Sequence, residues 1–98
     1  MNEKASVYRY LDQMGLDSKL NGYGYIAEAI LYVMAHPNSK MAECYKYISE
    51  KNGVTDANIM NGMRYAILSR SGNASSKVCG VKGFVRTAAN HLTTTVGV

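Results

Sequence analysis

The chain has 98 residues, of which 47% are hydrophobic, enough for one domain with a modest core. Its formal net charge of +4 is unevenly placed, because residues 1–50 hold five Lys/Arg against six Asp/Glu and residues 51–98 hold six against one. No apolar run reaches membrane-spanning length, and the first residues, MNEKASVYRYLDQMG, lack the apolar segment of a signal peptide. We therefore expect a single cytoplasmic domain over residues 1–98, with a basic C-terminal half suited to binding phosphate.

The first two predicted helices supply most of the core. One runs from Glu3 to Met14 and ends at Gly15, with one stripe facing inward: Val7, Tyr10, Leu11 and Met14. The second runs from Asn21 to Ala35 and is the most apolar, so we expect it at the centre; its inward face holds Tyr23, Ile26, Ala27, Ile30, Leu31 and Met34. Gly22 and Gly24 either weaken its first turn or let another backbone approach closely.

Two further helices joined by a tight turn are predicted between Lys40 and Arg70, after the break at HPNS and with Ser39 as the first cap. The first has one apolar face: Met41, Cys44, Tyr45 and Ile48. Gly53 can take the positive φ that ends a helix, and Thr55 can cap the next one. A small shared core would fix the angle between the two helices: Ile48, Val54, Ile59 and Met63. This is the plan of a helix-turn-helix, although an ordinary helical hairpin has the same pattern.

The outward side of the helix over residues 55–70 is polar and carries Asp56, Asn58, Asn61, Arg64 and Tyr65. Asn and Arg side chains can pair bidentately with adenine and guanine edges in the major groove of DNA. A polar loop over residues 71–76 follows, with Arg70, Lys77 and Lys82 around it. The last predicted helix spans 82–92 and directs Val81, Phe84, Val85, Ala88 and Leu92 inward, and we expect the tail of residues 93–98 to be frayed.

Cys44 and Cys79 are the only cysteines, and they form no CxxC motif. Cys44 falls on a predicted buried face, so we expect two reduced thiols rather than a disulfide. With His36 and His91 they would make four zinc ligands, but nothing in their spacing supports a metal site. We expect no metal and no cofactor, and His36 reads as an exposed structural residue.

The run GLDSKLNGYGYIAEAI over residues 15–30 resembles the start of a known domain. The matching residues are Gly15, Leu16, Leu20, Gly22, Tyr23, Tyr25, Ile26, Glu28, Ala29 and Ile30. The domain is the C-terminal DNA-binding domain of the sporulation-initiation response regulator, stage zero sporulation protein A. The later run MAECYKYISEKNGVTDANIMNGMRYAI resembles its scaffold helix, turn and recognition helix, and residues 71–73 resemble its loop.

This resemblance covers roughly residues 5–92 and implies an all-α fold of about six helices that binds DNA through the second helix of the hairpin. From pattern and resemblance together we expect a compact bundle of five to six helices containing a helix-turn-helix. The family binds its sites as a head-to-tail pair and is tethered to a receiver domain. We expect a stand-alone relative here, so phosphorylation control is not carried over.

The recognition helix departs from the family's, which reads Arg-Val-Glu-Arg-Ala-Ile-Arg-His where this chain has NIMNGMRY over residues 58–65. Only Arg64 is retained among the polar contacts, and Gly62 costs about 1 kcal/mol of helix stability against Ala. Each bidentate Arg contact that is lost changes base discrimination by roughly 1–3 kcal/mol. The remaining candidates for phosphate contacts are Lys40, Lys51, Thr55, Arg70, Lys77 and Lys82.

Two functions fit these observations. The first is a transcription regulator on double-stranded DNA, as a homodimer or as a heterodimer with a related regulator, in which Asn58, Asn61, Arg64 and Tyr65 contact bases. The second is a protein-interaction module of the same fold that has lost base-specific DNA binding and modulates a partner regulator. Met60, Met63 and Tyr65 make its recognition helix more apolar than the family's, which favours protein contacts. The sequence shows no paired-carboxylate, Cys-His or Ser-His-Asp pattern and no phosphate-cradling glycine loop, which argues against an enzyme.

Overall fold

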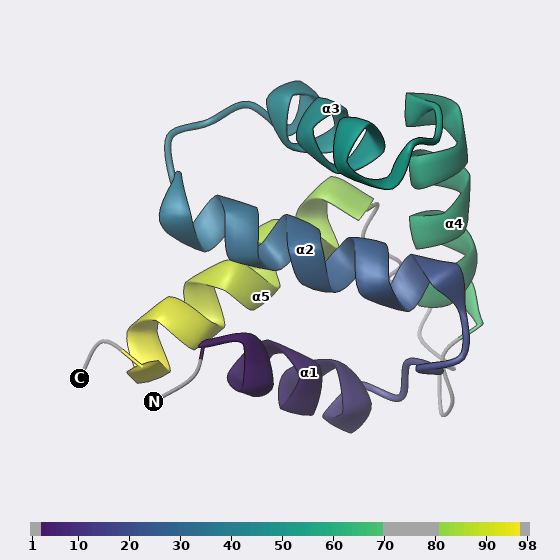
Figure 1. The fold of residues 1–98 in the computed structure, drawn as a ribbon. Coiled ribbons are helices and arrows are strands. Elements are labelled where there is room, and N and C mark those ends of the chain that lie inside the picture. Colours follow the sequence, from purple (N-terminus) through teal and green to yellow (C-terminus); the bar gives the residue numbers. More distant parts are fainter. Residues whose placement is uncertain (1–2, 70–80, 97–98) are drawn as a thin grey trace.

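The structure, a computed structural model, describes residues 3–69 and 81–96, with the side chains of residues 94–96 left aside. These residues form five helices and no strand (Figure 1): α1 (Glu3–Gln13), α2 (Asn21–Ala35), α3 (Met41–Asn52), α4 (Asp56–Leu68) and α5 (Val81–Val96). The predicted all-α fold is confirmed. The predictions for Arg70, the loop 71–76, Lys77 and Cys79 lie outside the described residues.

Helix α2 occupies the centre of the fold, as its apolar composition predicts. It packs against α1, α3, α4 and α5, and Figure 1 shows it running through the middle of the molecule, with α4 standing steeply across one end. Ile26, Ala27 and Ile30 are completely buried. The buried face is turned slightly from the predicted one, since Ala29 and Val33 complete it while Leu31 and Met34 are only half-buried.

The end of α1 differs from the prediction by one residue. Gly15 adopts φ 87°, and the N–H of Leu16 donates to the carbonyl of Leu11 at 3.1 Å, which closes the helix with a reversed turn. This turn folds Leu16 into the core at 5% exposure. Met14, predicted to face inward, is instead 37% exposed, because Leu16 occupies the site at the end of the apolar stripe.

The predicted cap of α3 is also wrong. The N-cap position belongs to Lys40, whose side chain makes no capping bond. Ser39 lies one residue earlier, and its hydroxyl donates to the carbonyl of His36 at 2.8 Å. The carbonyl of Ser39 accepts a hydrogen bond from Nη2 of Arg86 at 2.8 Å. Ser39 therefore ties the α2–α3 loop to α5 rather than starting α3.

Helix α5 begins at Val81 and extends to Val96, so it is longer than the predicted 82–92. No glycine or proline interrupts the chain between Gly83 and Gly97, and residues 93–96 of the tail predicted to fray add a further turn. The predicted inward face is confirmed, with Ala89 added to it: Val81, Phe84, Val85, Ala88 and Leu92.

Candidate nucleic-acid interface

The turn between α3 and α4 has the geometry that its sequence predicts. Gly53 lies in the left-handed region at φ 67°, and the N–H of Val54 donates to the carbonyl of Ser49 at 3.1 Å. The hydroxyl of Thr55 accepts a hydrogen bond from the N–H of Asn58 at 3.1 Å and so caps α4. Helix α4 itself spans Asp56–Leu68, inside the predicted range of 55–70.

The shared core beneath this turn holds the two helices at a set angle. Ile48, Ile59 and Met63 are completely buried, whereas Val54 is half-buried and packs against the edge of the core. A hydrophobic side chain two residues past the end of α3 commonly covers the last turn of such a helix. The predicted core is therefore present, with Val54 at its margin.

The polar side of α4 faces solvent. Asn58, Asn61, Arg64 and Tyr65 are all exposed, Tyr65 by 61%, while Ile59, Met63, Ala66 and Ile67 are buried on the opposite side. Asn58, Asn61 and Tyr65 follow one another at intervals of three and four residues, so they form one ridge, and Arg64 lies beside Asn61. A ridge of amide, guanidinium and phenol groups can donate and accept hydrogen bonds on a surface that enters a groove.

The position of α4 depends on two glycines that face each other across the α2–α4 contact. A Cβ added at Gly22 would lie 2.0 Å from the carbonyl oxygen of Gly62 and 2.9 Å from Cβ of Ala66. A Cβ added at Gly62 would lie 3.3 Å from the ring of Tyr25. The close backbone approach suggested for Gly22 is confirmed, whereas a Cβ added at Gly24 meets nothing within 4 Å, and the approach at Gly22 sets how far α4 stands out from the bundle.

The predicted phosphate contacts are spread over the surface. The ammonium of Lys51 lies 3.3 Å from Oε2 of Glu28, and Oε1 of the same carboxylate accepts a hydrogen bond from the side-chain amide of Asn52 at 3.0 Å. The hydrogen bond with Glu28 raises the pKa of Lys51. Lys40 is exposed at the opposite end of α3, roughly 16 Å along the helix axis, and Lys82 is exposed on the first turn of α5. Lys40 and Lys51 therefore lie at opposite ends of α3.

Arg86 is a cation that the sequence reading missed. It is half-buried, and besides its bond to Ser39 it lies close enough to Cys44 to affect that thiol. Burial raises the pKa of Cys44 to about 12, and the charge of Arg86 opposes the rise. Cys44 is free and fully buried, and among the described residues no three metal-binding side chains come together.

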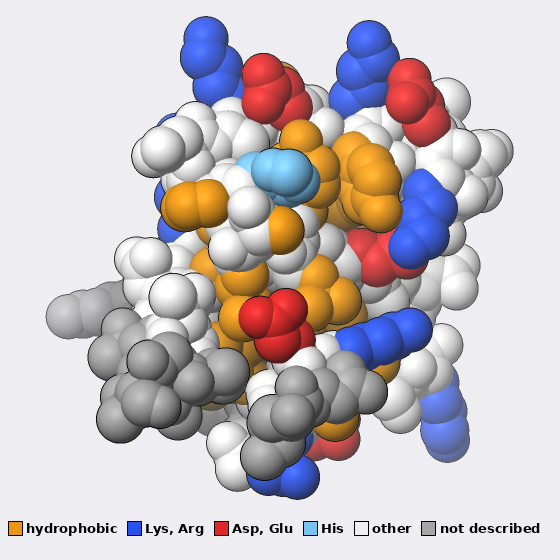
Figure 2. Space-filling view, turned by 60° about the vertical axis from the view of Figure 1, so that its left-hand side comes forward, with side chains coloured by type: hydrophobic (Ala, Val, Ile, Leu, Met, Phe, Trp, Pro, Cys, Tyr) orange, Lys and Arg blue, Asp and Glu red, His pale blue; other side chains and the backbone are white. Residues whose placement is uncertain are grey.

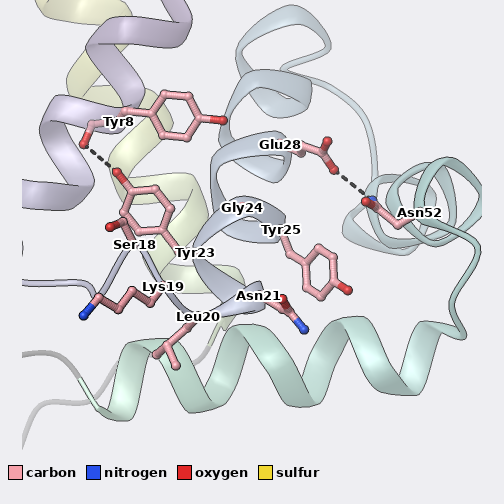
Figure 3. Close-up of a pocket in the computed structure, with 10 residues that line it drawn as sticks. All are labelled: Tyr8, Ser18, Lys19, Leu20, Asn21, Tyr23, Gly24, Tyr25, Glu28 and Asn52. Carbon is pink, nitrogen blue, oxygen red and sulfur yellow. Dashed lines mark hydrogen bonds between the residues drawn. The ribbon is translucent and has the colours of Figure 1, made fainter.

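A cavity of about 540 Å³ opens beside α4, between α1, the start of α2 and the end of α3 (Figure 3). Its lining is largely polar or aromatic: Tyr8, Ser18, Lys19, Leu20, Asn21, Tyr23, Gly24, Tyr25, Glu28 and Asn52. The hydroxyl of Tyr23 donates to the Asp12 carboxylate at 2.8 Å, and burial raises its pKa to about 12. This phenol stays protonated at neutral pH, so it offers hydrogen bonding rather than a base.

A second surface feature lies where α2 meets α3. The ring of Tyr32 is 4.7 Å from that of His36 and 5.2 Å from that of Tyr47, between ring centroids. Figure 2 shows hydrophobic side chains gathered around a histidine and bordered by charged groups of both signs.

Among the described residues, no helix combines the length and the apolar character that a membrane span requires.

Comparison with known proteins identifies a family. The family model described as "Sporulation initiation factor Spo0A C terminal" matches residues 7–94 of the 98-residue chain. The curated proteins contain no sequence that matches it.

Proposed function

Because this chain belongs to the family of Spo0A C-terminal domains, we propose that it regulates transcription by binding double-stranded DNA with α4 in the major groove. Domains of this family are in general DNA-binding regulatory domains and not catalytic ones. The observation that carries the proposal is the uncovered polar ridge of α4, held outward by the buried side of the same helix.

The ridge has side chains suited to reading bases. The major groove is about 12 Å wide and admits a helix, and Arg pairs bidentately with guanine while Asn pairs with adenine. Arg64 would read a guanine and Asn58 and Asn61 would read adenines, with Tyr65 on a base edge or the sugar-phosphate backbone. Each bidentate pair discriminates against the wrong base by about 1–3 kcal/mol.

Phosphate contacts would supply most of the affinity and its dependence on salt. Thr55 accepts from Asn58, and its hydroxyl hydrogen remains available to a phosphate oxygen. Lys40 and Lys82 are exposed, and Arg70 and Lys77 stay in the proposal as predicted from the sequence. Lys51 would have to loosen its contact with Glu28 first, so we rank it below the others. A homodimer on DNA, or a heterodimer with a related regulator, remains part of the proposal.

The test is selection of bound duplexes from a random pool, followed by titration of the selected site. Arg64→Ala should weaken binding to that site by about 5- to 150-fold and relax the preference at one position. Arg9→Ala, which removes an exposed cation from α1, should leave the preference unchanged. Binding of the unaltered chain that stays at background even at about 50 mM salt would refute the proposal.

A second candidate function is a protein-interaction module. It is favoured by Tyr65 and Leu68, exposed by 61% and 50% on α4. Met63 is fully buried, so the apolar area on this helix is narrower than the sequence suggested. A complex with a full-length regulator of this family, formed without DNA and lost in Tyr65→Ser and Leu68→Ser, would support this candidate. Light scattering after size exclusion measures it.

A further inference from the structure

The start of α2 lies along one side of α4, and that side is continuous with the exposed ridge. Gly22 meets the backbone of Gly62, and the ring of Tyr25 lies against the same glycine. Asn58 precedes Gly62 by four residues and therefore sits on the same side of α4, one turn closer to its beginning. Whatever binds over Asn58 consequently comes close to the first turns of α2.

Asn21 and Tyr25 occupy this position, and Lys19 lies just before α2, on the side of the end of α4. Lys19 and Asn21 are exposed, and Tyr25 is half-buried. Figure 3 shows Asn21 and Tyr25 projecting on the side of α2 where α3 leads into α4, whereas Lys19, in the segment before α2, projects to the opposite side. Within the described residues none of these three side chains donates a hydrogen bond to another group, although the backbone N–H of Lys19 donates to Asp17 at 2.9 Å. An ammonium, an amide and a phenol hydroxyl are thus available as donors.

The charge of the adjoining cavity suits an anion. Its one carboxylate, Glu28, is engaged by Lys51 and by the amide of Asn52, so its charge is largely compensated. Lys19 adds a cation without an ion-pair partner among the described residues. The open, polar-walled shape fits a solvated phosphodiester better than an apolar small molecule, which prefers an enclosed and mostly apolar site.

We propose that Asn21 and Tyr25 form a second DNA contact, on the phosphodiester strand that borders the major groove beside Asn58, and that Lys19 contacts the same strand further along, toward the end of α4. The inference rests on the proposed function. A helix with its side chains is about 10–12 Å across and fills a groove of about 12 Å, so elements flanking α4 face the backbone rather than base edges. This contact adds affinity and orients α4 without reading sequence.

Salt dependence tests the contact, because every phosphate neutralised by a cation releases counterions. Lys19→Gln should reduce the slope of log K against log salt by about 0.9, whereas Arg9→Gln, the same charge change on α1, should leave the slope unaltered. Tyr25→Phe keeps the ring on Gly62 and removes only the hydroxyl, so it should weaken binding about three- to tenfold for all sequences alike. Thermal unfolding of each variant confirms that the fold is kept.

The outcomes separate this inference from the proposed function. If the unaltered chain binds and Arg64→Ala relaxes base preference, while Lys19→Gln and Tyr25→Phe behave like Arg9→Gln, the second contact is refuted and the regulator stands. If Tyr25→Phe changes the preferred base instead of lowering affinity uniformly, the contact is not with phosphate, and the inference also fails. If the unaltered chain does not bind duplex DNA, both fail.

Discussion

Substituting Gly22 by Ala tests whether the crossing of α2 and α4 sets the position of the recognition helix. The added Cβ would stand 2.0 Å from the carbonyl oxygen of Gly62 and 2.6 Å from its carbon. Both are backbone atoms inside α4, so no side-chain rotation relieves the clash. Ordinary contact begins at 3.4 Å, which means that the two helices must separate by about 1.4 Å at this point.

The expected cost follows from this geometry. Overpacking a core typically costs about 1–3 kcal/mol, and a clash with backbone belongs at or above the upper end. Ala gains up to about 1 kcal/mol over Gly in a helix, which leaves a net loss of roughly 2 kcal/mol or more. For a domain of this size, that corresponds to a fall in Tm of about 8–16 °C.

Gly24 in the same helix is the matched control, because a Cβ there meets nothing within 4 Å. Gly24→Ala should stabilise the protein by about 0.5–1 kcal/mol. Urea unfolding followed by circular dichroism measures both variants. Ala66→Gly added to Gly22→Ala should not restore stability, because it removes the 2.9 Å contact but leaves the carbonyl of Gly62 in place. A Gly22→Ala variant as stable as Gly24→Ala would refute the reasoning.

Three other predictions concern single groups. Thr55→Ala should cost about 1 kcal/mol of unfolding free energy in a urea titration through loss of the bond from Asn58, whereas Thr55→Ser should retain most of it. Gly53→Ala leaves room for the added Cβ, but alanine disfavours the left-handed backbone conformation at φ 67°. The unfolding free energy should therefore fall by about 1–2 kcal/mol in the same titration, and an unchanged midpoint would contradict this prediction. The pKa of Cys44 rises from 9.0 to about 12 and that of Tyr23 from 10.0 to about 12. The unfolded chain therefore releases these protons first, and the unfolding free energy should fall as pH rises from about 9 to 12, less steeply in Cys44→Ala.

Local patterns in the sequence were enough to predict the helices and the turn between α3 and α4. Gly53 ends α3 and Thr55 caps α4 through contacts with residues no more than four positions away. The apolar spacing of Ile59 and Met63 likewise determines which side of α4 is buried. Residues within one or two helical turns produce these features, so the features can be predicted from the sequence without knowing how the helices pack.

Errors arose where a contact from a distant segment competes with the local one. Ser39 has the side chain of a cap, yet it bonds to His36 and accepts from Arg86, 47 residues further on. The phosphate contact of Lys51 stays a prediction, but its pairing with Glu28 in another helix was not predicted from the sequence. The pattern at either end of such a pair carries no information about the other end.

By itself the sequence determined an all-α fold, a glycine-cornered helix pair and the polar ridge of α4, because helical periodicity and capping act over a few residues. Only the tertiary structure decided that Gly22 lies against Gly62 and that the ring of Tyr25 lies against the same glycine. Those neighbours depend on the angle and depth at which α2 and α4 cross. That crossing results from packing the whole core at once, and no short stretch of chain encodes it.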